Sequence, residues 1–392
     1  MVADDLTHFV ALLGARAKAW AFARKAAKSA ETLSTQLIAS PEDLALIGPE
    51  WEELERSSPN PVTAFQSFAF QNAWASSFHG GAVQMRFVAV REKGRLVLVW
   101  PLAIEKSVMG LKGGWSGAPL AQYGDVVMAK GPRGNLWLEA ASREISSWSD
   151  VTYLDFSRVR ADGAIAGWLA RHATAKGETQ LSPVTDLARL TFDPAVLARN
   201  EKRLRRLKAQ GDVNFELLEG AAAAPLIAQA FAFKNEWARR KGLYGGALAD
   251  ERVAQVLENM AAHEGGLAVT RLSVDGETAA IEIGFRHGGR QYAFMGAFAP
   301  DFARLSPGHV LVEMTIRRCA QDGLAQYDPL PPSDSNKKAW SNRSIPVRDY
   351  GMVLTARGMV AHLLSARLRP LAKRVYEGLP LGLRRALRPV KG

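Results

Sequence analysis

Apolar and polar residues alternate along two stretches of the chain, residues 85–104 and residues 267–286. A period of two is typical of half-buried strands, and a turn pair interrupts each stretch, Lys93-Gly94 in the first and Asp275-Gly276 in the second. Each stretch is therefore predicted to form a strand, a tight turn and a second strand. Residues 290–298 predict a third strand after the second hairpin.

A helix and then a short apolar strand are predicted downstream of each hairpin. The strand is residues 151–157 in the first case and lies within residues 324–330 in the second. Asp155 and Asp328 then stand at matching ends of matching strands. This order predicts two copies of one α/β unit, each the size of a domain, joined near residues 185–200.

Helical segments are predicted between and before these strands. Residues 40–80 indicate helices interrupted by Gly48 and two prolines, and two more helices are expected at about 222–241 and 250–263. The basic segment 200–211 has leucines at the spacing of a buried helical stripe, with its bases outside that stripe. A solvated helix face is the favoured interpretation of those bases, and a nucleic-acid patch is the alternative.

The composition limits the class of protein. With 392 residues the chain exceeds the usual size of a single core, which agrees with two domains. Cys319 is its only cysteine, so it can form neither an intramolecular disulfide nor a cysteine-based metal site, and we expect a cytoplasmic protein. The apolar run near the amino terminus is too short to span a bilayer, so we expect neither export nor a transmembrane helix. The sequence contains no Ser-His-Asp order, no histidines at metal-ligand spacing and no P-loop ending. We therefore predict neither covalent catalysis nor a metal site.

The net charge of +11 is concentrated at one end of the chain. Residues 357–391 contain nine Lys or Arg against Glu377 alone, a net charge of +8. Leucines and arginines recur there at near-helical spacing, which predicts either a helix on an anionic membrane surface or a terminal helix that packs its leucines on the protein. Three prolines in this segment interrupt any single long helix.

Two segments of the second half are candidates for chemistry. In ARLSPGHV, residues 303–310, a helix is predicted to begin after Pro307, and a helix start offers free N–H groups and a positive dipole end to a phosphate. A Pro-Gly pair that only begins a helix is the alternative. In YDPLPPSDSNKKAWSN, residues 327–342, three prolines end a buried strand because they cannot donate ladder hydrogen bonds, and two lysines and a tryptophan follow.

The order of these elements resembles the GNAT-fold acyltransferases, and within them the cellulose-biosynthesis-type acetyltransferase branch, which is related to the Fem aminoacyltransferases. The likeness covers roughly residues 50–345. The motifs that carry it are Trp237 with Gly242, the strand DGETAAIEIGF, Pro307 with Gly308, Asp328 with Lys337 and Trp340, and, in the first half, FQSFAFQNAW and PLAI.

The resemblance implies an α/β (α+β) fold of tandem GNAT-like domains, each a mixed, mostly antiparallel sheet flanked by helices, with basic helices at the termini. The boundaries that it suggests are a helical extension (1–45), a first GNAT-like domain (46–190), a second, catalytic GNAT-like domain (191–356) and a basic amphipathic tail (357–392).

The resemblance also implies transfer of an acyl group from a thioester, usually acyl-CoA, to an amine or a hydroxyl. The phosphate loop of the family has small residues where this chain has Pro307 and His309, so aminoacyl-tRNA, the donor of the Fem relatives, stays open as an alternative. A noncatalytic scaffold of polysaccharide synthesis is a second alternative. Nucleic acid other than tRNA is not expected as a partner.

By the same resemblance, Lys337 is predicted to stabilise the tetrahedral oxyanion, with Trp340 packed below it and Lys338 facing water. The acceptor amine must lose a proton, and Glu282 is a candidate base because its strand face lies opposite an apolar face. Structural roles are the alternative throughout. The other predicted site residues are Tyr292 and Asp328 for catalysis, Arg304, Gly308, His309 and Val310 for the donor, and Trp237 and Trp340 for the substrate.

The expected acceptor is a lipid amine or an amino sugar of envelope or exopolysaccharide synthesis. The basic, leucine-rich tail favours an acceptor presented at the inner membrane, such as a long-chain base that is N-acylated. The resulting expectation is a cytoplasmic acyltransferase that associates peripherally with that membrane.

Overall fold

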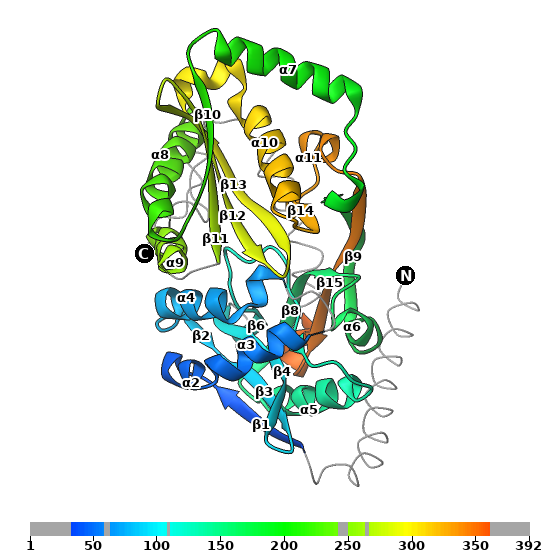
Figure 1. Cartoon of the computed structure of the whole chain (residues 1–392). Coiled ribbons are helices and arrows are strands. Elements are labelled where there is room, and N and C mark those ends of the chain that lie inside the picture. The colour runs from blue at the N-terminus through cyan, green and yellow to red at the C-terminus, as the bar shows by residue number, and fades with distance from the viewer. Residues whose placement is uncertain (1–32, 59–62, 108–109, 242–249, 263–265, 361–392) are drawn as a thin grey trace.

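The computed structural model describes residues 33–58, 63–107, 110–241, 250–262 and 266–360 (Figure 1). The strands of the first half are β1 (Leu33–Ile38), β2 (Val83–Met85), β3 (Phe87–Glu92), β4 (Arg95–Trp100), β5 (Leu102–Ser107), β6 (Gly110–Trp115), β7 (Val127–Met128), β8 (Val151–Arg160) and β9 (Thr174–Asp186). Its helices are α2 (Pro41–Leu46), α3 (Gly48–Ser57), α4 (Phe68–Phe78), α5 (Gly134–Ser146) and α6 (Ala166–His172).

The second half contains further strands and helices. The strands are β10 (Val213–Glu219), β11 (Leu267–Val274), β12 (Glu277–His287), β13 (Arg290–Phe298), β14 (Gln326–Asp328) and β15 (Arg343–Val353). The helices are α7 (Pro194–Lys208), α8 (Ala224–Arg240), α9 (Glu251–Ala261), α10 (Pro307–Gln321) and α11 (Ser335–Ala339). None of the helices in the described ranges combines the length and the apolar character that crossing a bilayer requires.

Both predicted hairpins are present, β3 with β4 and β11 with β12. Their turns use positive φ angles, 51° at Lys93 and 82° at Gly94, then 50° at Asp275 and 82° at Gly276. Two successive positive φ angles are the geometry of a tight hairpin turn, and a glycine adopts them without steric cost.

Each half also contains a parallel strand pair, as two copies of one unit require. β6 pairs with β8 in the first half and β13 with β14 in the second, and α5 and α10 lie between the paired strands in sequence. Asp155 is in register with Gly114, and Asp328 with Tyr292. Most other pairings are antiparallel, and the predicted mixed α/β fold with helices beside the sheet is confirmed.

The two halves share one long sheet. Within the described residues it has 11 strands in the order β10-β11-β12-β13-β14-β9-β15-β8-β6-β5-β2, and a second sheet has the order β1-β3-β4-β7. β15, which the sequence assigns to the second domain, lies between β9 and β8, because its buried Ile345 and Val347 complete that part of the sheet. The division into domains stays a prediction.

One predicted helical region is wrong in part. Residues 33–38, assigned from the sequence to a helical extension, form β1 and pair with β3. Ile38 is fully buried at the end of this strand, and the ladder with β3 supplies backbone hydrogen bonds, which outweigh the local helical preference. Residues 1–32 and 361–392, which include the predicted basic tail, lie outside the described residues.

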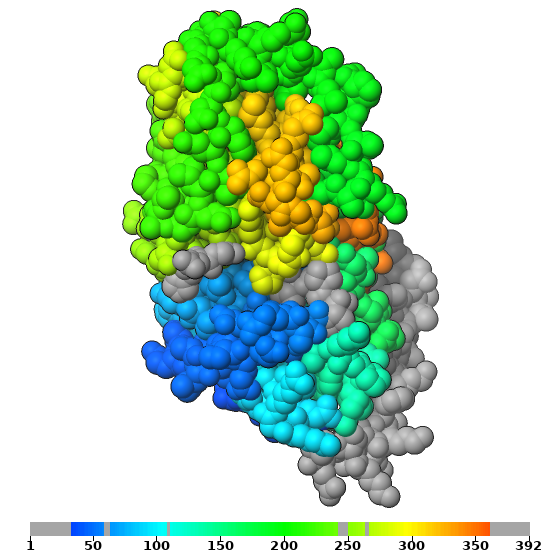
Figure 2. All heavy atoms as spheres, viewed as in Figure 1, coloured from blue at the N-terminus to red at the C-terminus, as the bar shows by residue number. Residues whose placement is uncertain are grey.

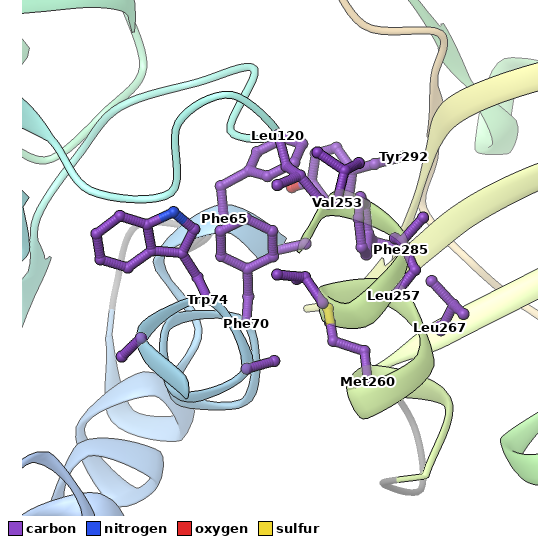
Figure 3. Packing of buried hydrophobic residues seen from close by; sticks show 14 of the residues in the cluster. Phe65, Phe70, Trp74, Leu120, Val253, Leu257, Met260, Leu267, Phe285 and Tyr292 are labelled. Carbon is purple, nitrogen blue, oxygen red and sulfur yellow. The ribbon is translucent and has the colours of Figure 1, made fainter. Parts of the chain in front are cut away.

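A single hydrophobic core joins the halves (Figure 3). Phe65 and Phe70, around the start of α4, contact Phe285 of β12 with ring centroids 5.5 Å and 5.8 Å apart. Phe65 also contacts Tyr292 of β13 at 6.1 Å. Such aromatic contacts add to the burial of apolar area and fix the second half against the first.

Candidate active site where β13 and β14 separate

The strands β13 and β14 pair over a short distance and then separate. Arg290–Tyr292 are in register with Gln326–Asp328, after which β13 continues to Phe298 while the other chain segment turns away. Pro329 follows β14 and cannot donate to a ladder, and Leu330 has a φ angle of 61°. The edge of β13 beyond Tyr292 is therefore free of β14.

Lys337 lies on one side of this separation. Its ammonium donates a hydrogen bond to the main-chain carbonyl of Leu330 at 2.7 Å, and the side chain is half-buried, whereas Lys338 is exposed. Trp340 is only 4% exposed and packs edge-on against Phe192. The proline-rich exit of β14 thus supplies the acceptor for the Lys337 ammonium, and the catalytic role of Lys337 stays a prediction.

Lys234, on α8, lies on the other side and is not among the site residues predicted from the sequence. Its ammonium donates to the main-chain carbonyl of Gly296 on β13 at 3.2 Å and lies 4.7 Å from the centre of the Trp237 ring. The spacing of Lys234 and Trp237, three residues apart on a helix, is the signal that could have indicated a cation–π pair.

Burial gives the two lysines unusual proton affinities. It lowers the pKa of Lys234, and it is also the largest cause of the lowered pKa of Lys337. The positive charge of Lys234 contributes to the lowered pKa of Lys337, so the two ammonium groups repel each other. Each ammonium is bonded to a main-chain carbonyl. Such a carbonyl carries only a partial charge, so it does not offset the lowering of the lysine pKa by burial.

Glu282 of β12 is the cross-strand partner of Gly296. The Glu282 carboxyl is 4% exposed and accepts a hydrogen bond from the Tyr327 hydroxyl at 2.8 Å, while its Oε1 has no partner among the described residues. As cross-strand partners, Gly296 and Glu282 share one face of the sheet. Gly296 has no side chain to cover this face, and a Cβ placed on it would meet no atom within 4 Å. Glu282 therefore lies next to open space, although it is buried rather than solvated.

Burial raises the pKa of Glu282 to about 7, with the Tyr327 hydrogen bond opposing the rise. A carboxyl with this pKa exchanges its proton near neutral pH, as a general base requires. The alternation in the strand places Ile281, Ile283 and Phe285 in the shared core, on the opposite face from Glu282.

The start of α10 is the predicted phosphate site. Ser306, with a φ angle of 56°, precedes the helix, and no side chain caps it. Gly308 faces open space, since a Cβ there would meet nothing within 4 Å, whereas the side chain of Val310 is buried. Figure 2 shows the yellow-orange residues of α10 on the surface, with green residues from earlier in the chain on both sides.

Arginines of α7 surround this helix start. Burial is the largest cause of the lowered pKa of His309, and the positive charges of Arg203 and Arg199 lower it further. Arg206 donates to the main-chain carbonyl of Arg304 at 3.1 Å. The free helix start and these cations together suit an anion with several charges.

Comparison with known proteins identifies the second half. Residues 196–338 match the family model described as an acetyltransferase (GNAT) domain. The chain thus contains a GNAT acetyltransferase domain. No curated protein matches its sequence.

Solved structures agree on the fold. FemX is 13% identical with a TM-score of 0.54, and the match covers 84% of this chain and 99% of FemX. The C-terminal domain of a putative lysylphosphatidylglycerol synthetase from Agrobacterium fabrum is 12% identical with a TM-score of 0.53, covering 82% of this chain and 96% of that domain. At these identities the likeness shows the fold, which the GNAT protein shares with the Fem transferases.

Asp328 is fully buried in the GNAT protein and joins its two halves. Its Oδ2 accepts a hydrogen bond from Arg160 of β8 at 2.9 Å, and its Oδ1 accepts from Tyr123 at 3.1 Å and from the Leu330 N–H at 2.9 Å. Burial raises the pKa of Asp328, and Arg160 opposes that rise. A carboxylate so fully bonded is suited to holding Leu330, on which Lys337 rests, rather than to exchanging protons.

The remaining predicted residues have little free surface. Tyr292 is fully buried, and burial raises its pKa, which disfavours a role as a base at neutral pH. Trp340 has little area left for a substrate, because it packs in a cluster with Ile316 and Tyr327. Trp237 is half-buried and stays available beside Lys234. Their roles in the GNAT protein stay predictions.

The raised pKa of Glu282 predicts how the stability of the GNAT protein changes with pH. The unfolded carboxyl loses its proton near pH 4.5 and the folded one near 7, so the free energy of unfolding should fall as pH rises from about 4.5 to about 7. Glu282→Gln cannot ionise and should remove up to about 3 kcal/mol of this fall. Burial also raises the pKa of Glu55 to about 7 and that of Asp125 to about 6. These two groups should leave a smaller pH dependence of the free energy of unfolding in the Glu282→Gln variant.

Urea unfolding at several pH values measures the slope. Glu277→Gln, on the same strand but exposed, is the matched control and should follow the wild type. If Glu282→Gln gives the same pH dependence as Glu277→Gln, then Glu282 does not hold its proton in the folded protein.

Proposed function

We propose that the protein transfers an acyl group from acyl-CoA to an amine of an envelope lipid or exopolysaccharide precursor. One observation carries this proposal. Lys337 and Lys234 lie where β13 and β14 separate, and Glu282 is in register with Gly296, the residue whose carbonyl accepts the Lys234 hydrogen bond. Cations for an oxyanion, a base for an amine and open space beside Gly296 are what acyl transfer needs.

The start of α10 supports acyl-CoA as the donor. Its uncapped N–H groups, Gly308 and the nearby Arg199 and Arg203 provide donors for several phosphate oxygens. α10 follows β13 in the chain, so a donor whose phosphates lie there can extend along the free edge of β13 toward Lys337.

The proposed reaction is direct. The neutral acceptor amine attacks the thioester carbonyl carbon, a C–N bond forms, and the C=O electron pair moves to the oxygen beside the Lys337 ammonium. Glu282 accepts the proton that the nitrogen loses. Collapse of the intermediate breaks the C–S bond, and the thiolate leaves and takes up a proton, so that an amide and free CoA result.

A long-chain base is the first acceptor to test. The basic, leucine-rich segment 357–392 motivates this choice, because such a segment favours contact with an anionic membrane surface, where a lipid amine is found. The proposal therefore places the protein in the cytoplasm at the inner membrane. Co-sedimentation with anionic vesicles that is unchanged by removal of residues 359–392 would oppose this placement.

The test is a turnover assay with palmitoyl-CoA and sphinganine, and in parallel with acetyl-CoA and glucosamine. A thiol-reactive dye detects free CoA, and mass spectrometry detects the amide. Cys319 gives little background, since it is buried and burial raises its pKa to about 12. We expect one pair to react, with Glu282→Gln lowering kcat by about 10²-fold or more and Glu277→Gln leaving it unchanged. Equal rates for the two variants would remove Glu282 as the base.

Aminoacyl-tRNA is the alternative donor. The arginines of α7 beside α10 and the fold shared with FemX favour it. Binding of tRNA should then weaken steeply as the salt concentration rises, whereas acyl-CoA should not raise the unfolding temperature. The opposite pair of results supports acyl-CoA.

A further inference from the structure

A groove of about 730 Å³ opens where β14 leaves β9. Its walls are residues 180–183 of β9, residues 331–333 after β14, and residues between 338 and 347 around the start of β15. Tyr327 and Thr185 form the end of the β14–β9 ladder, so the two chain segments diverge beyond this pair. None of the roles described above uses this groove.

The lining of the groove carries two cations and no acid. Lys338 and Arg343 are both exposed, and neither forms an ion pair with another described residue. Lys338 and Arg343 differ in this from exposed arginines that have a carboxylate partner, such as Arg240 with Glu236 and Arg317 with Glu313. Two unpaired cations in one concave surface attract an anion.

The rest of the lining suits an anion that is attached to an apolar group. The exposed Ser333 and Ser344 add hydroxyl donors. Leu181 is 58% exposed, which is unusual for a leucine in this protein, and Pro331 and Pro332 extend the apolar wall beside it. The guanidinium, the ammonium and the hydroxyls can donate hydrogen bonds from several directions. A phosphoryl group needs such an arrangement because it has several acceptor oxygens.

We propose that this groove binds a phosphoryl group and that the group is part of the acceptor. The 331–333 wall of the groove directly follows Leu330, whose carbonyl accepts the Lys337 hydrogen bond, so the groove adjoins the segment that supports Lys337. The start of α10 already serves the phosphates of the donor. Assignment to the acceptor rests on the proposed function, whereas binding of the phosphoryl group does not.

The test uses calorimetric titration of sodium pyrophosphate into the full chain, with coenzyme A present at saturation to fill the donor site. We expect the wild type to bind and the Lys338→Ala/Arg343→Ala double variant to bind about tenfold more weakly, or weaker still. The control double variant, Lys130→Ala/Arg95→Ala, removes the same charge from exposed positions elsewhere and should bind as the wild type does. Thermal unfolding verifies that both variants are folded.

Two results would overturn the proposal: absence of pyrophosphate binding by the wild type, or equal weakening in both double variants, which would indicate general charge attraction. Competition with dihexanoyl phosphatidylglycerol, compared with UDP-glucosamine, distinguishes a lipid phosphate from a nucleotide phosphate as the source. Failure of the proposed function gives a different result, in which acyl-CoA is not turned over but pyrophosphate binding still depends on Lys338 and Arg343.

Discussion

Replacing Lys337 with alanine is expected to lower kcat for acyl transfer by about 10²- to 10³-fold while leaving the KM for the donor nearly unchanged. The reason is that the Lys337 ammonium, held on the Leu330 carbonyl at 2.7 Å, is the cation proposed to lie beside the developing oxyanion. A charge that is fixed before the reaction stabilises the transition state more than the ground state, so its loss reduces kcat.

Steady-state kinetics with saturating acceptor measure this effect. Lys130→Ala, at an exposed lysine far along the chain, is the control for the loss of one positive charge. The hydrogen bond from the charged ammonium to Leu330 contributes about 1.5 to 3 kcal/mol, which is less than the stability of a typical domain, so Lys337→Ala should remain folded. A kcat within a few-fold of the wild type would show that Lys337 is not the oxyanion donor.

Replacing Asp328 with alanine should lower the free energy of unfolding by about 3 kcal/mol or more. The substitution leaves Arg160, whose side chain is 4% exposed, without one of its two carboxylate partners in the interior. It also removes the acceptor of the Leu330 N–H and of the Tyr123 hydroxyl. Because Leu330 holds Lys337, kcat should fall together with stability.

Asp155→Ala is the matched control, since Asp155 has the corresponding place in the first half. Its carboxylate is 24% exposed and pairs with Lys176 at 2.9 Å, so its loss should reduce the free energy of unfolding by less than about 1 kcal/mol. Urea unfolding followed by tryptophan fluorescence compares the two variants. Similar losses for both would mean that the buried pair of Arg160 and Asp328 does not hold the halves together.

Local patterns in the sequence predict much of this fold. The alternation around Lys93-Gly94 and Asp275-Gly276 locates both hairpins, and the order of strand and helix locates the repeated parallel pairs. The prolines after Asp328 and the buried Trp340 locate the support of Lys337. These features depend on neighbours in the chain, and so a single sequence can show them.

Contacts between distant segments could not be predicted in this way. Arg160 and Asp328 are 168 positions apart, and nothing in either segment indicates that one neutralises the other. Lys234 approaches Lys337 only because α8 and the end of β14 lie beside the same strand, β13. The burial of Glu282 results from packing of the face that it shares with Ala280, which involves segments distant in the chain.

A crystal structure of the chain with an acyl-CoA analogue, in which a methylene ketone replaces the thioester, tests most directly where the reaction takes place. We predict the ketone oxygen within about 3 Å of the Lys337 ammonium, beside Gly296, with the phosphates at the start of α10. An analogue bound with its ketone away from Lys337, or with its phosphates away from Gly308, would contradict the proposed site.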